Sequence, residues 1–268
     1  MVRGRGPQRS EIHPPMITFS LQSGSNGNSI YVEAGDTRLL FDAGITGALA
    51  EKRLAEYGRD IREVHALFVS HDHQDHIRCA GVYQRKFGLP IYMTRATRDA
   101  SSCPLGQLDD VRSFKSGDSI ALNGVTVHTI PTPHDAADGV AFVVEFEGRR
   151  LGILLDLGHP FDGLRGVLES VDAVYLEANY DREMLEAGSY PSWLKARIQG
   201  DGGHISNDEA ARLLADCARN RPKWVAVAHL SADNNRPELA MGAPRALVGD
   251  DYPVFLAPRT GPSELLEV

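Results

Sequence analysis

The run HDHQDH at residues 71–76 constrains this chain more than any other segment of its sequence. It follows HALFVS, an apolar stretch typical of a strand, and leads into a stretch with the apolar spacing of a helix. In an extended chain, residues two apart point to the same side, so we expect His71, His73 and Asp75 to converge while the residues between them turn away. The turn into the helix then brings His76 to the same place. The segment therefore predicts four ligand-type side chains at one strand end.

Three imidazoles suit a borderline metal such as zinc, and a carboxylate takes a second ion or orients a water. A lone HxH is more often a solvated loop, but further ligand-type residues here share one context, just after a predicted strand or in a loop before a helix. They are His134, Asp156, His204 and His229. Asp156 follows the apolar segment LGILL, where a buried carboxylate needs compensation. A position between two cations would supply it.

The predicted elements alternate between short apolar strands and amphipathic helices. The expected strands are MITFSLQS, SIYVEAG, TRLLFDAG, HALFVS, LPIYMTR, DSIALNGVTVHTIP, GVAFVVEFEGRRLGILLDLG, VDAVYLEAN, KWVAVAH and PVFLAP. The expected helices are 46–57, 76–87, 161–169, 181–199 with a break near Pro191, 207–219 and 236–247. Short polar turns predict hairpins at 34–37 and 146–149. This order favours an α/β sandwich of two sheets packed face to face, with helices outside.

Residues 16–268 contain no linker or composition break and are expected to form a single domain, preceded by a flexible N-terminal tail over 1–15. The sequence has no membrane-length apolar segment and no signal peptide, so a cytoplasmic protein without membrane contact is expected. The net charge of −8 argues against a protein held to nucleic acid mainly by phosphate contacts. Bound divalent ions would offset that charge locally. We interpret Cys79, Cys103 and Cys217 as packing residues.

The HxHxDH motif, followed in order by His, Asp and His across residues 71–229, resembles the metallo-β-lactamase superfamily. The resemblance is closest to the YycJ/WalJ-like group, through LQSGSNGNSIYVE, FDAG, LEANYDREML, YPSWLKARI, GHISNDEA and AHLSADNN. It implies a four-layer αββα metallo-β-lactamase sandwich and two divalent metal ions, with zinc expected and manganese or iron as alternatives. The implied ligands are His71, His73 and His134 for one ion and Asp75, His76 and His229 for the other, with Asp156 bridging.

Two ions roughly 3.5–4 Å apart lower the pKa of a shared water so that it supplies hydroxide. Asp75 is expected to orient this hydroxide or to receive its proton. His204 stands in GGHISNDEAARLL, which looks like the ribonuclease Z element, and the resemblance implies that it protonates the leaving alkoxide. A structural or capping role is the alternative for His204. Asp42 in LLFDAG matches a family position and is expected to orient a ligand.

Other polar residues have two interpretations each. Asn179, Asp181, Asn234 and Asn235 lie in group motifs and either bind substrate or make turns. The basic residues near the expected pocket form either a phosphate-binding rim or solvated helix faces, and they are Arg95, Arg98, Arg182, Lys195 and Arg197. The remaining histidines are expected to be satisfied or surface imidazoles, and they are His13, His65, His128 and His159. SGSNGNS lacks the order and the lysine of a nucleotide P-loop.

These features together favour a metal-dependent phosphodiesterase or nuclease. Glyoxalase II-like thioester or lactone hydrolysis is one alternative, although it would not need His204 as an acid, and a cyclic phosphodiesterase on a small substrate is another that suits the acidic charge. Di-iron redox relatives carry Glu where this chain has His73, whereas sulfur dioxygenases keep a histidine there. A β-lactamase would be expected to carry an export signal. A non-enzyme scaffold would be expected to have lost a ligand, and the ligand set is complete.

Overall fold

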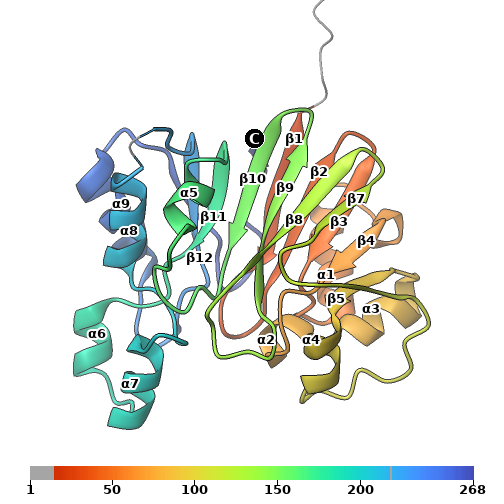
Figure 1. Cartoon of the computed structure of the whole chain (residues 1–268), viewed down its shortest axis with the longest axis horizontal. Helices are drawn as coiled ribbons and strands as arrows, with labels where there is room; N and C mark the ends of the chain where they lie inside the picture. Colours follow the sequence, from red (N-terminus) through yellow and green to blue (C-terminus); the bar gives the residue numbers. More distant parts are fainter. Residues whose placement is uncertain (1–14, 218) are drawn as a thin grey trace, which may run out of the picture.

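The structure is a computed structural model that describes residues 15–217 and 219–268. In this part of the chain, two seven-stranded mixed sheets pack face to face, and helices cover their outer sides (Figure 1). The predicted four-layer sandwich is therefore confirmed. The expected tail lies, except for Pro15, outside the described residues, and its separation from a single domain stays a prediction.

The first sheet has the strand order β14-β1-β2-β3-β4-β5-β6. Its strands are β1 (Met16–Gln22), β2 (Ser29–Ala34), β3 (Thr37–Phe41), β4 (Ala66–Phe68), β5 (Ile91–Thr94), β6 (Val111–Phe114) and β14 (Leu266–Glu267). The strands from β14 to β3 pair antiparallel, and those from β3 to β6 pair parallel. The predicted hairpin at 34–37 is confirmed, because Ala34 pairs with Thr37.

The second sheet has the order β13-β12-β11-β10-β9-β8-β7. Its strands are β7 (Ser119–Leu122), β8 (Val125–Pro131), β9 (Val140–Phe146), β10 (Arg149–Leu154), β11 (Ala173–Glu177), β12 (Trp224–Ala228) and β13 (Val254–Leu256). The run from β10 to β13 is parallel, so the carboxyl ends of these strands meet at one edge. The predicted hairpin at 146–149 is also confirmed, by the pairing of Phe146 with Arg149.

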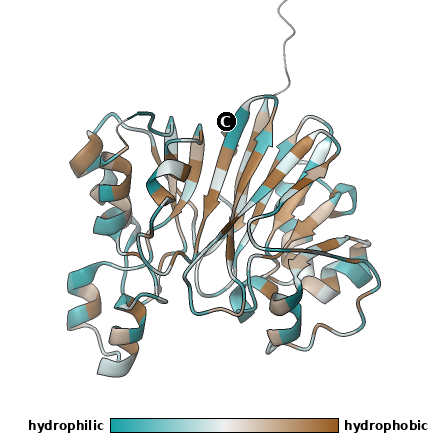
Figure 2. Ribbon diagram, viewed as in Figure 1, coloured by the Kyte–Doolittle hydropathy of each residue, from teal (hydrophilic) through white to brown (hydrophobic). Residues whose placement is uncertain are grey.

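Strand alternation builds the core. In β2, Ile30 and Val32 point between the sheets, whereas Tyr31 points toward the outer helices. Phe41 and Phe142 meet across the sheet interface with ring centroids 5.1 Å apart. Figure 2 shows the resulting hydrophobic bands along the strands. The same period-2 pattern separates the inter-sheet core from the two helix-covered cores.

The helices fall into two sets. α1 (Gly47–Glu56) and α3 (Ala80–Phe87) pack on the first sheet, and α5 (Leu164–Leu168), α8 (Asn207–Ala215) and α9 (Pro237–Val248) pack on the second. Shorter helices lie toward one end of the sandwich in Figure 1: α2 (Gln74–Ile77) and α4 (Arg95–Ala100) on one side, α6 (Arg182–Ala187) and α7 (Ser192–Gln199) on the other. A 3-10 turn, η1, spans Ile61–Glu63. Within the described ranges, no helix is long and apolar enough to span a membrane.

Several predicted boundaries were wrong. The helix expected over 76–87 is two helices, because the Cys79 N–H leaves the helical pattern to bond the Ala43 carbonyl. The single strand expected over 118–131 is a hairpin, turned at Asn123 and Gly124 with positive φ angles. The short elements β6, β14, α4 and η1 were not predicted. The break near Pro191 separates α6 from α7 as expected.

Candidate metal centre

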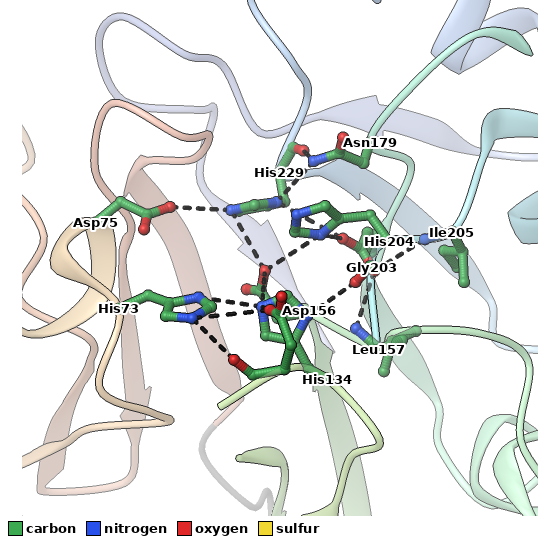
Figure 3. A network of polar contacts seen from close by, with 12 residues as sticks. His73, Asp75, His134, Asp156, Leu157, Asn179, Gly203, His204, Ile205 and His229 are labelled. Carbon is green, nitrogen blue, oxygen red and sulfur yellow. Dashed lines mark hydrogen bonds and ion pairs between the residues drawn. The ribbon is translucent and has the colours of Figure 1, made fainter. Parts of the chain in front are cut away.

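The proposed ligand residues gather at one end of the sandwich, where strands of both sheets end. They are His71, His73, Asp75, His76, His134, Asp156 and His229. The first four follow β4 or belong to α2, and the last three follow β8, β10 and β12. Figure 3 shows members from both sheets converging on Asp156. The sandwich therefore brings together side chains that are up to 158 residues apart in sequence, from His71 to His229.

His71, His73 and His134 form one group, whose ligand-type atoms lie within 4.8 Å of one another. His134 Nδ1 donates to the Gly203 carbonyl at 2.8 Å, and His73 Nε2 donates to the Asp135 carbonyl at 3.2 Å. A neutral imidazole has one N–H, so the nitrogens left over carry lone pairs. These two, His134 Nε2 and His73 Nδ1, face each other at 3.2 Å. Two lone pairs at this distance favour a cation between them.

Asp75, His76 and His229 form a second group within the same limit. Asp75 Oδ2 lies 3.2 Å from His229 Nε2 and 3.4 Å from His76 Nε2. His76 Nδ1 donates to Asp42 Oδ2 at 2.7 Å, which aims Nε2 at the site. Asp42 therefore makes the orienting contact that the sequence predicted.

Asp156 lies between the two groups. One of its oxygens, Oδ2, is 3.1 Å from His76 Nε2, and the other, Oδ1, is 3.6 Å from both His134 Nε2 and His229 Nε2. The side chain is buried at the end of β10, with 4% of the residue exposed. A single carboxylate thus reaches nitrogens of both groups.

Two buried atoms argue that these residues fit divalent ions. Among the described residues, His71 Nε2 has no hydrogen-bond partner, and Asp156 Oδ2 has none of good geometry, its nearest nitrogen being His76 Nε2 at 3.1 Å. His71 Nδ1 contacts Ser70 Oγ at 2.9 Å, so its Nε2 is the nitrogen that faces the site. Leaving buried polar atoms unsatisfied is costly, and native structures rarely do so without a reason. Imidazole nitrogens and carboxylate oxygens are a donor set for divalent metals.

The backbone is strained at three residues of the site. Asp42, Asp156 and His229 have φ angles of 65°, 51° and 56°, in the left-handed region. Each residue comes directly after a strand or one residue beyond it, so the strand direction ends and the side chain turns into the site. Such strain clusters at functional sites, where surrounding contacts hold it in place.

The charges of the site are strongly coupled. Burial alone would lower the pKa of His229, but Asp156, Asp75 and Glu177 outweigh it and raise that pKa to about 10. Burial alone would also lower the pKa of His76, but Asp156, Asp42 and Asp75 outweigh it. They raise that pKa well above its ordinary value. His71 differs, because burial and the neighbouring His76 hold its pKa well below the ordinary value. The buried carboxylates therefore stabilise positive charge, as protons or cations, at this site.

Glu177, at the end of β11, is a site residue that the sequence analysis missed. It is fully buried, and its Oε1 lies 2.6 Å from His204 Nδ1. Its Oε2 accepts hydrogen bonds from the backbone N–H groups of Leu157 and Ile205. Burial would raise the pKa of Glu177, but His204 and His229 outweigh it and lower that pKa to about 2. The available signal was an acid ending an apolar strand, the same signal that singled out Asp156.

His204 lines a cavity of about 580 Å³ above the ligand groups, together with Asp75, Asp156, Asn179 and His229. Its Nδ1 is taken by Glu177, so Nε2 is the nitrogen available to a molecule in the cavity. His204 also belongs to a group of candidate ligands with Asp156, Glu177 and His229. The geometry therefore brings His204 to the site, with its Nε2 left for a molecule in the cavity.

The three asparagines expected at the substrate site differ in placement. Asn179 lines the cavity and donates to the His229 carbonyl at 2.9 Å. Asn235 is buried outside the cavity lining and bonds the carbonyls of Ala178 and Asn179. Asn234 is also buried outside the lining, and its carbonyl accepts from the Asp181 N–H. Asn234 and Asn235 thus bond backbone groups outside the lining, and substrate contact stays a prediction for all three asparagines.

Two further expectations were also tested by geometry. The extended pattern assumed for residues 71–75 holds only to His73, because α2 begins at Gln74, and Asp75 reaches the site from the first turn of that helix. The prediction that Asp72 and Gln74 turn away was wrong, because both line the same cavity as Asp75 and Asp156.

The remaining predicted residues lie as follows. Of the basic residues, Arg197 lines the cavity, whereas Arg95, Arg98, Arg182 and Lys195 do not. His65, His128 and His159 are hydrogen-bonded away from the site, as expected, and His13 lies outside the described residues. Cys79, Cys103 and Cys217 carry free thiols.

Comparisons with known proteins agree with this geometry. A sequence profile of the Metallo-beta-lactamase superfamily matches residues 23–229. Exodeoxyribonuclease YycJ of Bacillus anthracis is 36% identical, over 82% of this chain and 84% of the relative. Exodeoxyribonuclease WalJ of Streptococcus pneumoniae is 35% identical, over 82% of this chain and 83% of the relative.

Solved structures share the fold at low sequence identity. The metallo-beta-lactamase fold protein YhfI of Bacillus subtilis has a TM-score of 0.73 at 18% identity, covering 95% of this chain and 100% of that one. Human tRNase Z, short form, has a TM-score of 0.63 at 16% identity, and the match covers 94% of this chain and 98% of that one. At these identities the likeness is one of fold alone.

Proposed function

This chain belongs to the metallo-β-lactamase superfamily, is a hydrolase of that fold, and from this premise we propose that it is a two-metal nuclease that cleaves phosphodiester bonds of DNA. The observation that carries the proposal is the complete pair of ligand groups joined by Asp156, with the Glu177–His204 pair beside them at the cavity. The names of the relatives that are 35–36% identical support a nuclease, and DNA as its substrate.

We assign His71, His73 and His134 to one ion and Asp75, His76 and His229 to the other, with Asp156 shared. These residues would hold two divalent ions, whose chemistry there would be to lower the pKa of a water and to stabilise charge on the oxygens of the reacting phosphate. Zinc is the proposed metal because nitrogen donors dominate the set, and manganese and iron accept the same donors.

Asp75 is proposed to orient the attacking water. Its Oδ2 is engaged by His229 and by Asn28 Nδ2, at 3.2 and 3.3 Å. Its Oδ1 makes no hydrogen bond within the described residues, and the side chain lines the cavity. A carboxylate held by one oxygen leaves the other to accept a hydrogen from water.

His204 is proposed as the general acid that protonates the leaving alkoxide. The Glu177 carboxylate accepts its Nδ1–H and stabilises the cationic imidazolium. The proton on Nε2 then faces the cavity and is the one transferred. Thioester hydrolysis has a far less basic leaving group, so this pair of a buried Glu177 and a cavity-lining His204 favours phosphodiesters over the glyoxalase II-like alternative.

The reaction class is tested with metal-reconstituted protein on bis(p-nitrophenyl) phosphate, on labelled DNA and RNA oligonucleotides and on a thioester. We expect both phosphodiester types to be cleaved, with DNA preferred over RNA. Cleavage should vanish with a chelator and in Asp75→Ala. Thioester turnover with inert phosphodiesters would contradict the proposal, and cleavage of bis(p-nitrophenyl) phosphate without oligonucleotide cleavage would favour a small-substrate phosphodiesterase.

A further inference from the structure

Helix α7 forms part of the cavity wall but has no buried residue of its own. Leu194, Arg197 and Ile198, which lie on one face of the helix, line the cavity. Beside them, Trp193 exposes 69% of its surface, the largest fraction among the exposed large hydrophobic residues of the described chain. The indole is thus mostly open to solvent, next in sequence to the cavity-lining Leu194.

The helix is anchored to the catalytic loops at both ends. The His204 N–H donates to the Ile198 carbonyl at 2.9 Å, next to the proposed acid. At the other end, the Tyr190 hydroxyl donates to Asp233 Oδ2 at 2.7 Å, in the loop that follows His229. The helix that carries Trp193 is therefore tied to loops of the site on both sides.

The charge of α7 is suited to an anionic ligand. Its sequence, SWLKARIQ, carries Lys195 and Arg197 and no acid. Arg197 Nε donates to Asp135 Oδ2 at 2.7 Å, and its Nη groups make no hydrogen bond within the described residues. Trp193 and Arg197 are four residues apart, so they lie on the same side of the helix and about 6 Å apart along its axis. The indole and the guanidinium therefore start from neighbouring positions on one side of the helix.

We propose that α7 is a binding platform for single-stranded nucleic acid, on which the Trp193 indole stacks on a base and the Arg197 guanidinium contacts a backbone phosphate. This inference rests on the proposed function, and it adds that the nucleic acid is bound as a single strand. Asp156, at the base of the cavity, is 4% exposed, so a reacting phosphate has to enter the cavity. The bases flanking that phosphate leave their stack and become free to stack on a side chain.

The test compares the wild type with Trp193→Ala, Trp193→Phe and the control Leu247→Ala. Leu247 is an exposed hydrophobic residue on α9, outside the cavity lining, with 54% of its surface exposed. Affinity for a phosphorothioate single-stranded DNA, which resists cleavage, is measured by anisotropy. We expect Trp193→Ala to weaken binding roughly 5- to 150-fold, Trp193→Phe to weaken it much less, and Leu247→Ala to leave it unchanged.

Tryptophan fluorescence reports the contact directly. The chain has two tryptophans, and the other, Trp224, is buried in β12 with 7% exposed. Binding is expected to quench the fluorescence of the wild type, and the quenching should disappear in Trp193→Phe while most of the affinity remains. In the same assay, Arg197→Gln should reduce the slope of log affinity against log salt by about 0.7, the value for one phosphate contact on a single strand.

The outcomes separate this inference from the proposed function. Wild type that cleaves neither oligonucleotides nor bis(p-nitrophenyl) phosphate overturns the proposed function. Wild type that cleaves oligonucleotides, while Trp193→Ala binds them with unchanged affinity, overturns the stacking inference alone. A change from dimer to monomer in Trp193→Ala, at unchanged affinity for DNA, would instead identify α7 as a self-association surface.

Discussion

His204 is the residue whose role the structure makes most testable, because its Nδ1 is fixed by Glu177 and its Nε2 is free toward the cavity. If it is a general acid, His204→Ala should lower kcat on DNA by about 100- to 10,000-fold. The loss on bis(p-nitrophenyl) phosphate should be much smaller, because p-nitrophenolate leaves without needing a proton. Metal content should stay at two ions per chain by elemental analysis. A fall in metal content would identify His204 as a ligand.

Glu177 is a positioning residue, and its effect should pass through His204. Glu177→Gln keeps an oxygen for the N–H groups of Leu157 and Ile205 but removes the charge that stabilises the imidazolium. We expect kcat on DNA to fall while KM changes little. In Glu177→Gln/His204→Ala the loss should equal that of His204→Ala alone, because residues that act as one unit are not additive. Additive losses in this double-mutant cycle would show that Glu177 acts by another route.

At the residue scale, the sequence predicted side chains that stand out from their neighbours. Asp156 and His229 were found because each ends an apolar strand. Glu177 ends an apolar strand in the same way, yet it matched no motif position with a stated role. The contacts of Asn234 and Asn235 were unpredictable, since turn-making and substrate contact use the same residue type. Which of these residues faces the cavity depends on packing between segments that are far apart in the chain.

Among the secondary-structure elements, α2 carries Asp75 and His76, and its position depends on close contact with the loop after β3. A Cβ added at Gly44 would lie 1.7 Å from the Asp75 carbonyl oxygen and 2.6 Å from the Asn28 nitrogen. Gly44→Ala should therefore displace α2, lower the free energy of unfolding by about 1–3 kcal/mol and reduce the metal content. Thermal unfolding and elemental analysis measure the two effects.

Gly166 in α5 provides the matched control, because an added Cβ there meets nothing within 4 Å. Gly166→Ala is expected to leave the metal content unchanged and to stabilise the helix by up to about 1 kcal/mol. Equal behaviour of the two variants would show that the Gly44 contact does not position α2.

Long elements with a clear period were predicted from the sequence, and short ones were not. β2, β9 and β12 alternate or run apolar over five residues or more, which defines a strand without tertiary information. β14 has two residues and exists because it pairs with β1, and α4 is a single short helix after β5. Their formation depends on neighbours that the local sequence does not contain. The break between α2 and α3 likewise depends on a bond to Ala43.

For the molecule as a whole, the metal centre joins the two sheets. His71 and His76 come from the side of the first sheet, and His134, Asp156 and His229 come from strands of the second. Ions bound between them would add a link between elements that already meet through the apolar core and through the His76–Asp156 and His229–Asp75 contacts. The same arrangement concentrates buried carboxylates, so the metal-free site holds protons in place of metal ions. Metal binding is therefore expected to be coupled to proton release.

The sign of this coupling follows from the raised pKa values. In the metal-free protein, His229 has a pKa of about 10, and that of His76 also lies well above its ordinary value, so both are protonated at pH 7.5. A nitrogen that ligates a metal has to lose its proton, so the ion held by His76 and His229 releases their protons when it binds. Metal affinity should then rise with pH up to about pH 10 and fall as the pH decreases, by up to tenfold per pH unit for each proton released.

Calorimetric titration of Zn²⁺ at pH 7.5, in two buffers with different ionisation enthalpies, gives the number of protons released. We expect about two per protein, one each from His76 and His229. His65→Ala should give the same number, because His65 accepts a hydrogen bond from the Arg38 N–H away from the site. A heat of binding that does not depend on the buffer would mean that these histidines are already neutral before metal binds. The carboxylates would then be neutralised in another way, and the charge balance derived from Asp75, Asp156 and Glu177 would be wrong.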